Sequence, residues 1–410
     1  MDGGGFWRSI GLNRPVLALS VARMADAVGN SILFIMLPLY VAGLPSPGFD
    51  APVPVLVGLL ISLYGLASAV TQPLTGAWSD RAGRRKVFIL AGLALIGLGT
   101  VGFIFATRFL DLLVLRAVQG VGVALTIPAT MAIMTAVSEK ATRGGSMGIY
   151  TTLRMTGYAM GPILGGILKV RLGFDAAFLA GAAFLLTAMI LIQVWVTDTP
   201  LEKRPEGPRR FRVFDPKLLS PGLLSAGLAT FLMANAFSLV AALENEFNAR
   251  LGIDAFGFGI AFSALMVGRL LSQTPLGHWS DKIGRRPLVL AGLLFLAPVT
   301  ALLGLVPALW QLVGLRVLQG VASACIAAPA FAIAGDLSRR EGAGRQLSVV
   351  TMGFGLGIAV GPLLGGLLDT LSFELPFLAA GGMCLAGAWV VGRFMPETVE
   401  RAARGPAPRA

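Results

Sequence analysis

Long apolar stretches separated by short polar segments run along the whole chain. Twelve of these stretches have the roughly 20 residues that an α-helix needs to cross a bilayer. They cover residues 15–42, 54–75, 87–107, 110–136, 146–168, 176–197, 219–243, 255–275, 288–306, 309–335, 346–368 and 375–395. No stretch shows strand-length alternation, so a β-barrel is excluded and each backbone amide is expected to bond within its own helix. The pattern predicts an all-α polytopic membrane protein with twelve transmembrane helices.

The amino-acid composition is typical of an integral membrane protein. Of the 410 residues, 55% are hydrophobic and 13% are charged, about half the charged share of soluble proteins. The net charge is +12, but the basic residues lie in short loops and form no continuous basic face, so nucleic acid is not an expected partner. Cys325 and Cys384 fall inside apolar stretches, which favours packing over a disulfide. The first apolar stretch is too long for a cleavable signal peptide.

The placement of lysine and arginine predicts the orientation in the membrane. Most of the 33 basic residues lie in the amino-terminal segment, the loops after even-numbered helices and the carboxyl tail. The opposite side holds only Arg108, Lys169, Arg171 and Arg250. Because cytoplasmic loops carry the excess of positive charge, we expect a multi-pass protein of the inner (cytoplasmic) membrane with both termini in the cytoplasm.

Three sequence segments occur twice, at offsets of 200 or 201 residues. The first copies are GAWSDRAGRR (76–85), LRAVQGVGVA (115–124) and GPILGGIL (161–168), and the second copies begin at residues 277, 315 and 361. Six predicted helices separate the copies, so the two halves have the same orientation, as in transporters with parallel repeats. The repeat predicts six-helix bundles over 1–197 and 218–410, joined by a cytoplasmic linker over 198–217.

The repeated decamer resembles the signature of the major facilitator superfamily between helices 2 and 3, of the form G-x-x-x-D-[RK]-x-G-R-[RK]. The resemblance extends over nearly all of the chain. The matching residues are Gly76, Asp80, Gly83, Arg84 and Arg85, with Gly277, Asp281, Gly284, Arg285 and Arg286 in the second copy. The resemblance implies the fold of that family, in which two six-helix bundles rock against each other to give alternating access.

The decamer is also a candidate gate. Gly76 and Gly277 are expected to let a neighbouring helix approach closely. Asp80 is expected to meet the positive amino end of a helix of the other bundle, with Arg84 paired to the same carboxylate. Such contacts would hold the cytoplasmic side closed. The alternative is topogenic charge alone, which explains the arginines but neither the glycines nor the aspartates.

Two further motifs resemble those of proton-coupled drug antiporters in the family. Arg116, Gln119 and Gly120 on helix 4 resemble a signature whose buried arginine is linked to proton transfer. The helix 5 motif of antiporters matches Gly157, Gly161, Pro162, Gly165 and Gly166. The alternative is that these small residues only allow close helix packing. Both motifs recur in the second half, at Arg316–Gly320 and at Gly361, Pro362, Gly365 and Gly366. This repetition suggests packing inherited with the repeat and weakens the motifs as evidence for export.

Asp26 is the one acid that the sequence places well inside a predicted helix. Arg23, Asp26 and Asn30 are spaced to form one polar stripe on helix 1. Ionisable residues inside a bilayer are costly and mark ion or substrate pathways. We therefore expect Asp26 to carry the proton and Arg116 to promote its release, with a static Asp26–Arg23 ion pair as the alternative.

The predicted substrate cavity is positive. Arg154, Arg269 and Arg316 are embedded as well as Arg23 and Arg116, and Gln119 and Asn235 add neutral polar groups. This excess of arginine disfavours a site for cationic drugs only, although some arginines could instead extend to the interface. Glu244 and Glu246 are expected at a solvated outer rim.

The sequence thus predicts a secondary transporter that exports small amphipathic compounds in exchange for protons. A carrier of an organic anion or lipid-like metabolite is the alternative, and a non-transporting receptor is disfavoured by paired gates. The expected partners are the bilayer, a small molecule and protons, and the functional unit is expected to be a monomer. One histidine cannot form a metal site, and no phosphate loop or nucleophile–base pair is evident, so neither enzymatic activity nor a cofactor or metal is expected.

Overall fold

The structure, a computed structural model, describes residues 13–82, 84–137, 143–197, 220–337 and 343–399, and these residues form helices and short connections. The predicted linker 198–217 lies outside them. The helices of the first half are α2 (Arg14–Val41), α3 (Val53–Ala82), α4 (Arg85–Gly102), α5 (Phe109–Val137), α6 (Arg143–Leu172) and α7 (Phe174–Trp195). Those of the second half are α8 (Pro221–Ser238), α9 (Glu244–Leu251), α10 (Ala255–Ile283), α11 (Arg285–Leu302), α12 (Leu309–Leu337), α13 (Ala343–Asp369) and α14 (Leu375–Phe394).

Local sequence explains where the central helices begin. The Asn13 side chain accepts a hydrogen bond from the Val16 amide at 2.8 Å, and a proline follows inside the first turn of α2. Ser220 repeats this arrangement at the start of α8 by accepting from the Leu223 amide at 3.2 Å. Both residues are favoured amino-terminal caps.

The span prediction agrees with the structure in all but one detail. Eleven spans among the described residues are long and apolar enough to cross a membrane, counting α8, the 3₁₀ segment Leu239–Leu243 and α9 as one. The remaining predicted span, 146–168, coincides with α6, which has 30 residues. Its polar residues and glycines set α6 apart from the other spans. Its composition is consistent with its position, because α6 packs on α2 of its own half and on α10 of the other half.

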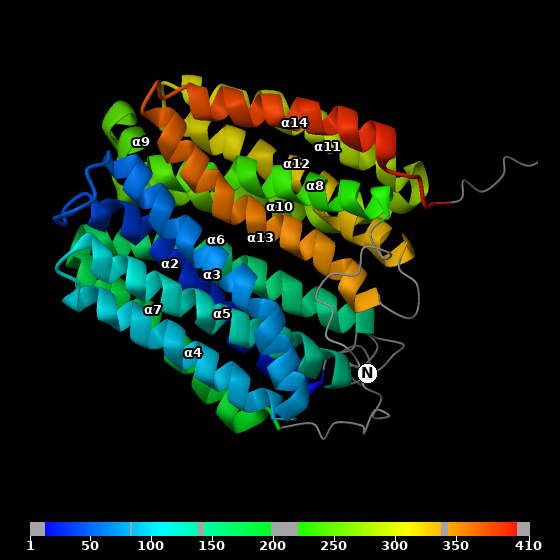
Figure 1. Cartoon of the computed structure of the whole chain (residues 1–410), viewed down its shortest axis with the longest axis horizontal. Coiled ribbons are helices and arrows are strands. Elements are labelled where there is room, and N and C mark those ends of the chain that lie inside the picture. The colour runs from blue at the N-terminus through cyan, green and yellow to red at the C-terminus, as the bar shows by residue number, and fades with distance from the viewer. Residues whose placement is uncertain (1–12, 83, 138–142, 198–219, 338–342, 400–410) are drawn as a thin grey trace, which may run out of the picture.

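The helices lie side by side along the long axis of the molecule (Figure 1). We call the end where α2 begins and α14 ends the terminal end, and the end that carries α9 the distal end. α2 packs against α6 in the first half, and α8 packs against α13 in the second. The halves meet through α3 on α13 and α6 on α10.

Contacts between the halves lie in the distal parts of these helices. Phe34 stacks on Phe262 with ring centroids 5.6 Å apart, and Asn245 of α9 donates a hydrogen bond to the Pro38 carbonyl oxygen of α2 at 2.8 Å. One buried apolar cluster, which includes Ile32 and Val240, extends through both halves at this level. The distal end is therefore closed by packing across the two halves.

Candidate functional site

The polar stripe predicted on α2 is present and buried. Asp26 is 3% exposed, and its carboxylate forms an ion pair with Arg23 of the preceding turn. Asn30 donates a hydrogen bond from Nδ2 to the other carboxylate oxygen at 2.7 Å. Spacings of three and four residues put these groups on one helix face. The structure thus brings all three side chains together around the Asp26 carboxylate.

A small cavity borders Arg23 and Asp26. Its volume is about 20 Å³, which is enough for one water molecule. The hydroxyl-bearing residues Thr126 and Thr130 of α5 line it together with apolar residues of α2, α4 and α7. Burial in a low-dielectric interior makes the charge state of Asp26 depend strongly on this ion pair.

Arg116, expected to act on Asp26, lies in a different polar cluster. Its guanidinium donates to Gln119 Oε1 at 3.1 Å and lies 5.0 Å from the ring centroid of Tyr64. No hydrogen bond or ion pair joins it to Asp26 within the described part of the chain. The direct partner of Asp26 is therefore Arg23 and not Arg116.

The second half repeats the Arg116 cluster. Arg316 donates to Gln319 Oε1 at 2.8 Å, and Gln319 donates to Thr300 Oγ1 at 3.0 Å, as Gln119 does to Thr100 at 2.9 Å. Arg316 also donates to the Phe237 carbonyl oxygen at 3.2 Å. A cluster present in both halves indicates shared packing of α4 with α5 and α11 with α12.

Asn235 is buried where α8 meets α13, and its Nδ2 atom has no partner.

The remaining embedded arginines, Arg154 and Arg269, come from α6 and α10 of opposite halves. Arg269 is 6% exposed and Arg154 is half-buried. Their charges interact with each other, and Arg154 also interacts with Asp26. These two like charges repel each other across the boundary between the halves.

The glycine motif of α6 has two packing faces. A Cβ atom at Gly157 would lie 2.5 Å from the Met24 carbonyl oxygen, and one at Gly161 would lie 2.7 Å from the Val28 carbonyl oxygen. Gly165 continues this face along α2 with a 3.2 Å approach to Ile32. These approaches are too close for a side chain, so the glycines let α6 pack directly on the α2 backbone.

The second face of the motif packs across the two halves. A Cβ atom at Gly166 would lie 2.6 Å from the Ala255 carbonyl oxygen, and the Pro162 carbonyl oxygen lies equally close to a Cβ built on Gly259. α13 repeats both faces: Gly361 packs on α8 and Gly365 on Leu239 of the following 3₁₀ segment, whereas Pro362 and Gly366 pack on α3. The motif therefore shapes the distal contact between the halves as well as each half.

The decamers differ from the expectation at their glycines. A Cβ at Gly76 would lie 3.5 Å from Pro128, which is ordinary contact, and one at Gly277 would meet nothing within 4 Å. Neither glycine is therefore required by a close helix in this conformation. Gly284 is required for another reason, because its φ of 108° is in the left-handed region. Gly83 and the Asp80 side chain lie outside the described residues, and Arg84 is exposed before α4.

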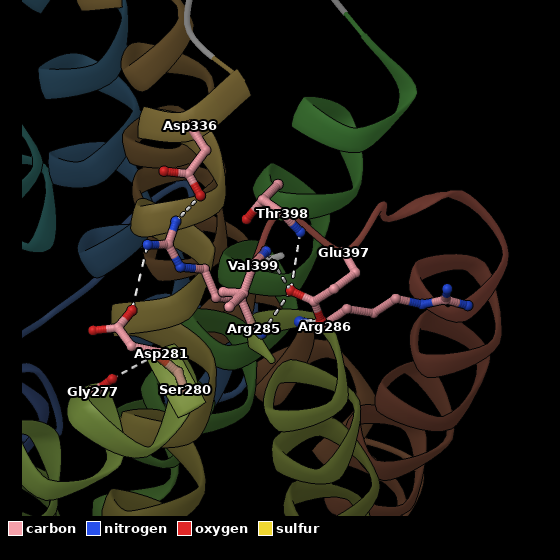
Figure 2. A network of polar contacts seen from close by, with 9 residues as sticks. All are labelled: Gly277, Ser280, Asp281, Arg285, Arg286, Asp336, Glu397, Thr398 and Val399. Atoms are coloured by element: carbon pink, nitrogen blue, oxygen red, sulfur yellow. Dashed lines mark hydrogen bonds and ion pairs between the residues drawn. The ribbon is translucent and has the colours of Figure 1, made fainter. Parts of the chain in front are cut away.

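The second decamer belongs to a polar network within its own half (Figure 2). Arg285 forms ion pairs with Asp281 of the decamer, at 3.4 Å, and with Asp336 at the end of α12. Arg286 donates to the Gly392 carbonyl oxygen of α14. Asp281 is thus paired within its own half, and the latch expected at Asp80 stays a prediction, because that side chain lies outside the described residues. Arg85 of the first decamer also has interaction partners, so it is not a free cation.

Glu397, after α14, caps α11 in the same network (Figure 2). Its carboxylate accepts from the backbone amides of Arg285 at 3.0 Å and Arg286 at 3.2 Å, and from those of Thr398 and Val399. Burial opposes ionisation of the Glu397 carboxyl, but these four donors outweigh it and lower its pKa below the ordinary value. Neither Asp336 nor Glu397 was identified from the sequence, because their partners are far away along the chain.

Glu244 corrects the expectation of a solvated rim. It is 0% exposed, and neither carboxylate oxygen has a hydrogen-bond partner. The 3₁₀ segment Leu239–Leu243 turns the chain so that α9 packs on α2. The charged group that faces Glu244 is Lys169 of α6. A carboxyl group is thereby enclosed where the halves meet, which hydropathy alone did not indicate.

Comparisons with known proteins agree with this architecture. A family model described as Major Facilitator Superfamily matches residues 19–243 and again 223–409. The multi-drug resistance efflux pump PmrA homolog of Lactococcus lactis is 28% identical over 82% of this chain and 84% of its own length. The multidrug resistance protein MdtG of Escherichia fergusonii is 27% identical over 87% of this chain and 88% of its own.

Solved structures show the same fold. A bacterial homolog of the human lysosomal transporter Spinster, in an inward-facing and unoccupied conformation, matches with a TM-score of 0.70 at 20% identity, covering 93% of this chain and 92% of that one. The human organic anion transporter MFSD10 matches with a TM-score of 0.68 at 21% identity, covering 92% and 99%. At these identities the likeness concerns the arrangement of helices.

Proposed function

Because the chain belongs to the Major Facilitator Superfamily, we propose that it exports small amphipathic compounds in exchange for protons by alternating access. It is a multi-pass membrane transporter, and its relatives include a homolog of a multi-drug resistance efflux pump and a multidrug resistance protein. The observation that supports proton exchange is the burial of the Asp26 carboxyl group within the first half, where a small cavity borders it.

Asp26 can couple the proton to the substrate through Arg23. While Asp26 is ionised, its carboxylate occupies Arg23 and accepts from Asn30. Protonation removes the negative charge and frees the guanidinium. The local charge around α2 therefore changes by one unit, and a substrate that senses this charge binds one protonation state more tightly than the other. Arg23 thus takes the role that the sequence suggested for Arg116.

The conformation with a closed distal end can be assigned to one step of the proposed alternating-access cycle. With the termini in the cytoplasm, as the basic loops predict, the distal end faces the periplasm of an inner-membrane protein. Phe34, Phe262 and the Gly166 contact close that end. In this proposal the conformation is inward-facing and takes its substrate from the cytoplasm. Both halves that alternating access needs are present in one chain, which supports a monomer as the functional unit.

The test is transport by the Asp26→Asn variant in proteoliposomes. The variant should fold, lose accumulation driven by a pH gradient, and keep exchange of substrate down its own gradient, because Asn imitates the permanently protonated acid. Asp175→Asn, a change at an exposed carboxylate at the distal end of α7, is the matched control and should behave as wild type. Gradient-driven transport by Asp26→Asn at the wild-type rate would overturn the coupling role.

A carrier of an organic anion or a lipid-like metabolite is the second candidate function. The observation that favours it is the absence of an acid partner for Arg154 and Arg269 among the described residues. Currents recorded from proteoliposomes on a solid-supported membrane, with cationic, neutral and anionic amphiphiles, separate the two. Signals from anions alone would favour the carrier, and signals from cations alone would exclude it.

A further inference from the structure

Arg154 and Arg269 are two interior cations that no acid pairs with directly among the described residues. Neither forms a hydrogen bond or an ion pair with any residue in the described ranges, and the Nε atom of each is buried without an acceptor. The nearby acid Asp26 is already bound by Arg23 and Asn30. Leaving a buried charge unpaired is costly unless another group compensates it. The site is therefore incomplete as the chain alone builds it.

Helix register places the two arginines at the same depth. α6 and α10 run in opposite directions and touch where Pro162 meets Gly259. Arg154 is eight residues from that contact and Arg269 ten, both toward the terminal end. At 1.5 Å per residue these separations are roughly 12 and 15 Å along the two helices. Since the two charges also interact, they face each other across the boundary of the halves.

We propose that Arg154 and Arg269 form an anion-binding site between the two halves, which takes the acidic head of an amphipathic substrate. The proposal rests on the transport function above and narrows its substrate class. Guanidinium groups suit carboxylate, phosphate and sulfate, which they bind through paired charge-assisted hydrogen bonds. Two of them, one from each half, can hold one such head from both sides.

Aromatic rings beside the arginines accommodate the apolar part of the substrate. The Arg154 guanidinium lies 6.0 Å from the ring centroid of Tyr158, and that of Arg269 lies 5.9 Å from that of Phe354 on α13. Both rings are half-buried. An acidic head at the arginines therefore places its hydrocarbon against aromatic surface, which selects amphiphiles over small inorganic anions.

The site also links binding to the conformational change. Two like charges on opposite halves repel each other, and this repulsion grows as the halves approach at the terminal end. A bound anion cancels the repulsion and attracts both halves. Substrate binding thus favours closure at the terminal end, which must occur before the distal end opens.

Binding of octyl phosphate, compared with uncharged octanol, tests the site. The full-length protein in nanodiscs of zwitterionic lipid is titrated calorimetrically, without a proton gradient, so a failure of proton coupling does not affect the result. We expect Arg154→Gln and Arg269→Gln each to weaken octyl phosphate binding about tenfold or more, and octanol binding to stay unchanged. Arg250→Gln, at an exposed ion pair with Glu374, is the matched control and should bind as wild type.

Arg269→Lys keeps the charge and should retain octyl phosphate binding, which separates loss of charge from loss of fold if the Gln variants are unstable. Wild-type affinity in both Gln variants, or an equal loss in Arg250→Gln, would overturn the site. A further titration in nanodiscs with phosphatidylglycerol identifies the source of the anion. Competition by this lipid would assign the arginines to a lipid headgroup and overturn their assignment to a free substrate.

Discussion

Gly166→Ala should weaken closure of the distal end. The added Cβ would lie 2.6 Å from the Ala255 carbonyl oxygen and 2.7 Å from Phe256 Cα, where ordinary contact begins at 3.4 Å. The deficit is about 0.8 Å, and both neighbours are backbone atoms of α10 that no side-chain rotation can move. Overpacking of this kind costs about 1–3 kcal/mol. Because the contact joins the two halves, this cost falls on the state with the distal end closed and shifts the ratio of closed to open molecules by about 5–150-fold.

Spin labels at exposed positions 50 and 249, one on each half at the distal end, measure this ratio by double electron–electron resonance. Cys325 and Cys384 are replaced first, so that only the introduced cysteines react. Gly148→Ala, on the same helix but with nothing within 4 Å of the added Cβ, is the control for the higher helix propensity of alanine. Equal distance distributions for Gly166→Ala and Gly148→Ala would show that α6 does not set the distal contact.

Two other substitutions test carboxyl groups that the sequence did not identify. Glu244→Gln should favour the closed distal end, because a neutral amide is less costly to bury there than a carboxyl group without a hydrogen-bond partner. In the same spin-label experiment, Glu246→Gln should leave the ratio of closed to open molecules unchanged. Glu397→Gln should lower the free energy of unfolding by about 0.5–2 kcal/mol, as loss of a helix cap does. Because the pKa of Glu397 is lowered in the folded state, this stabilisation is full above the unfolded pKa of about 4.3 and is lost as pH falls through the folded value. Thermal unfolding at pH 7 and below pH 4 checks this, and an equal difference at both values would contradict the capping role.

The fold was predictable because each helix is encoded by its own apolar stretch and because the motifs recur in both halves. The contact of Arg23 and Asn30 with Asp26 was predictable for the same local reason, since spacing along one helix determines which side chains meet. α6 was recognised as a span by its place in the repeat, although it is more polar than the other helices.

The features that were not predictable depend on packing between distant segments. Glu244 looks like a residue of an exposed helix end, and its burial requires the 3₁₀ segment before it and the α2 surface that covers it. The second face of Gly166 appears only when α10 lies against it. The preference of Asp26 for Arg23 over Arg116 depends on rotamers and on the position of α5 relative to α2. Sequence spacing contains none of this information.

Capping of α11 by Glu397 has a consequence for biosynthesis. The capped amide of Arg285 precedes Glu397 by 112 residues, which corresponds to roughly 6–20 s of translation at 5–20 residues per second. During this time the start of α11 lacks its acceptor from the chain, and backbone donors at a helix start must then be satisfied by water or other groups. A nascent chain that stops after Phe394 would contain every membrane span and still lack this bond. The segment that follows α14 thus completes a helix that was inserted much earlier.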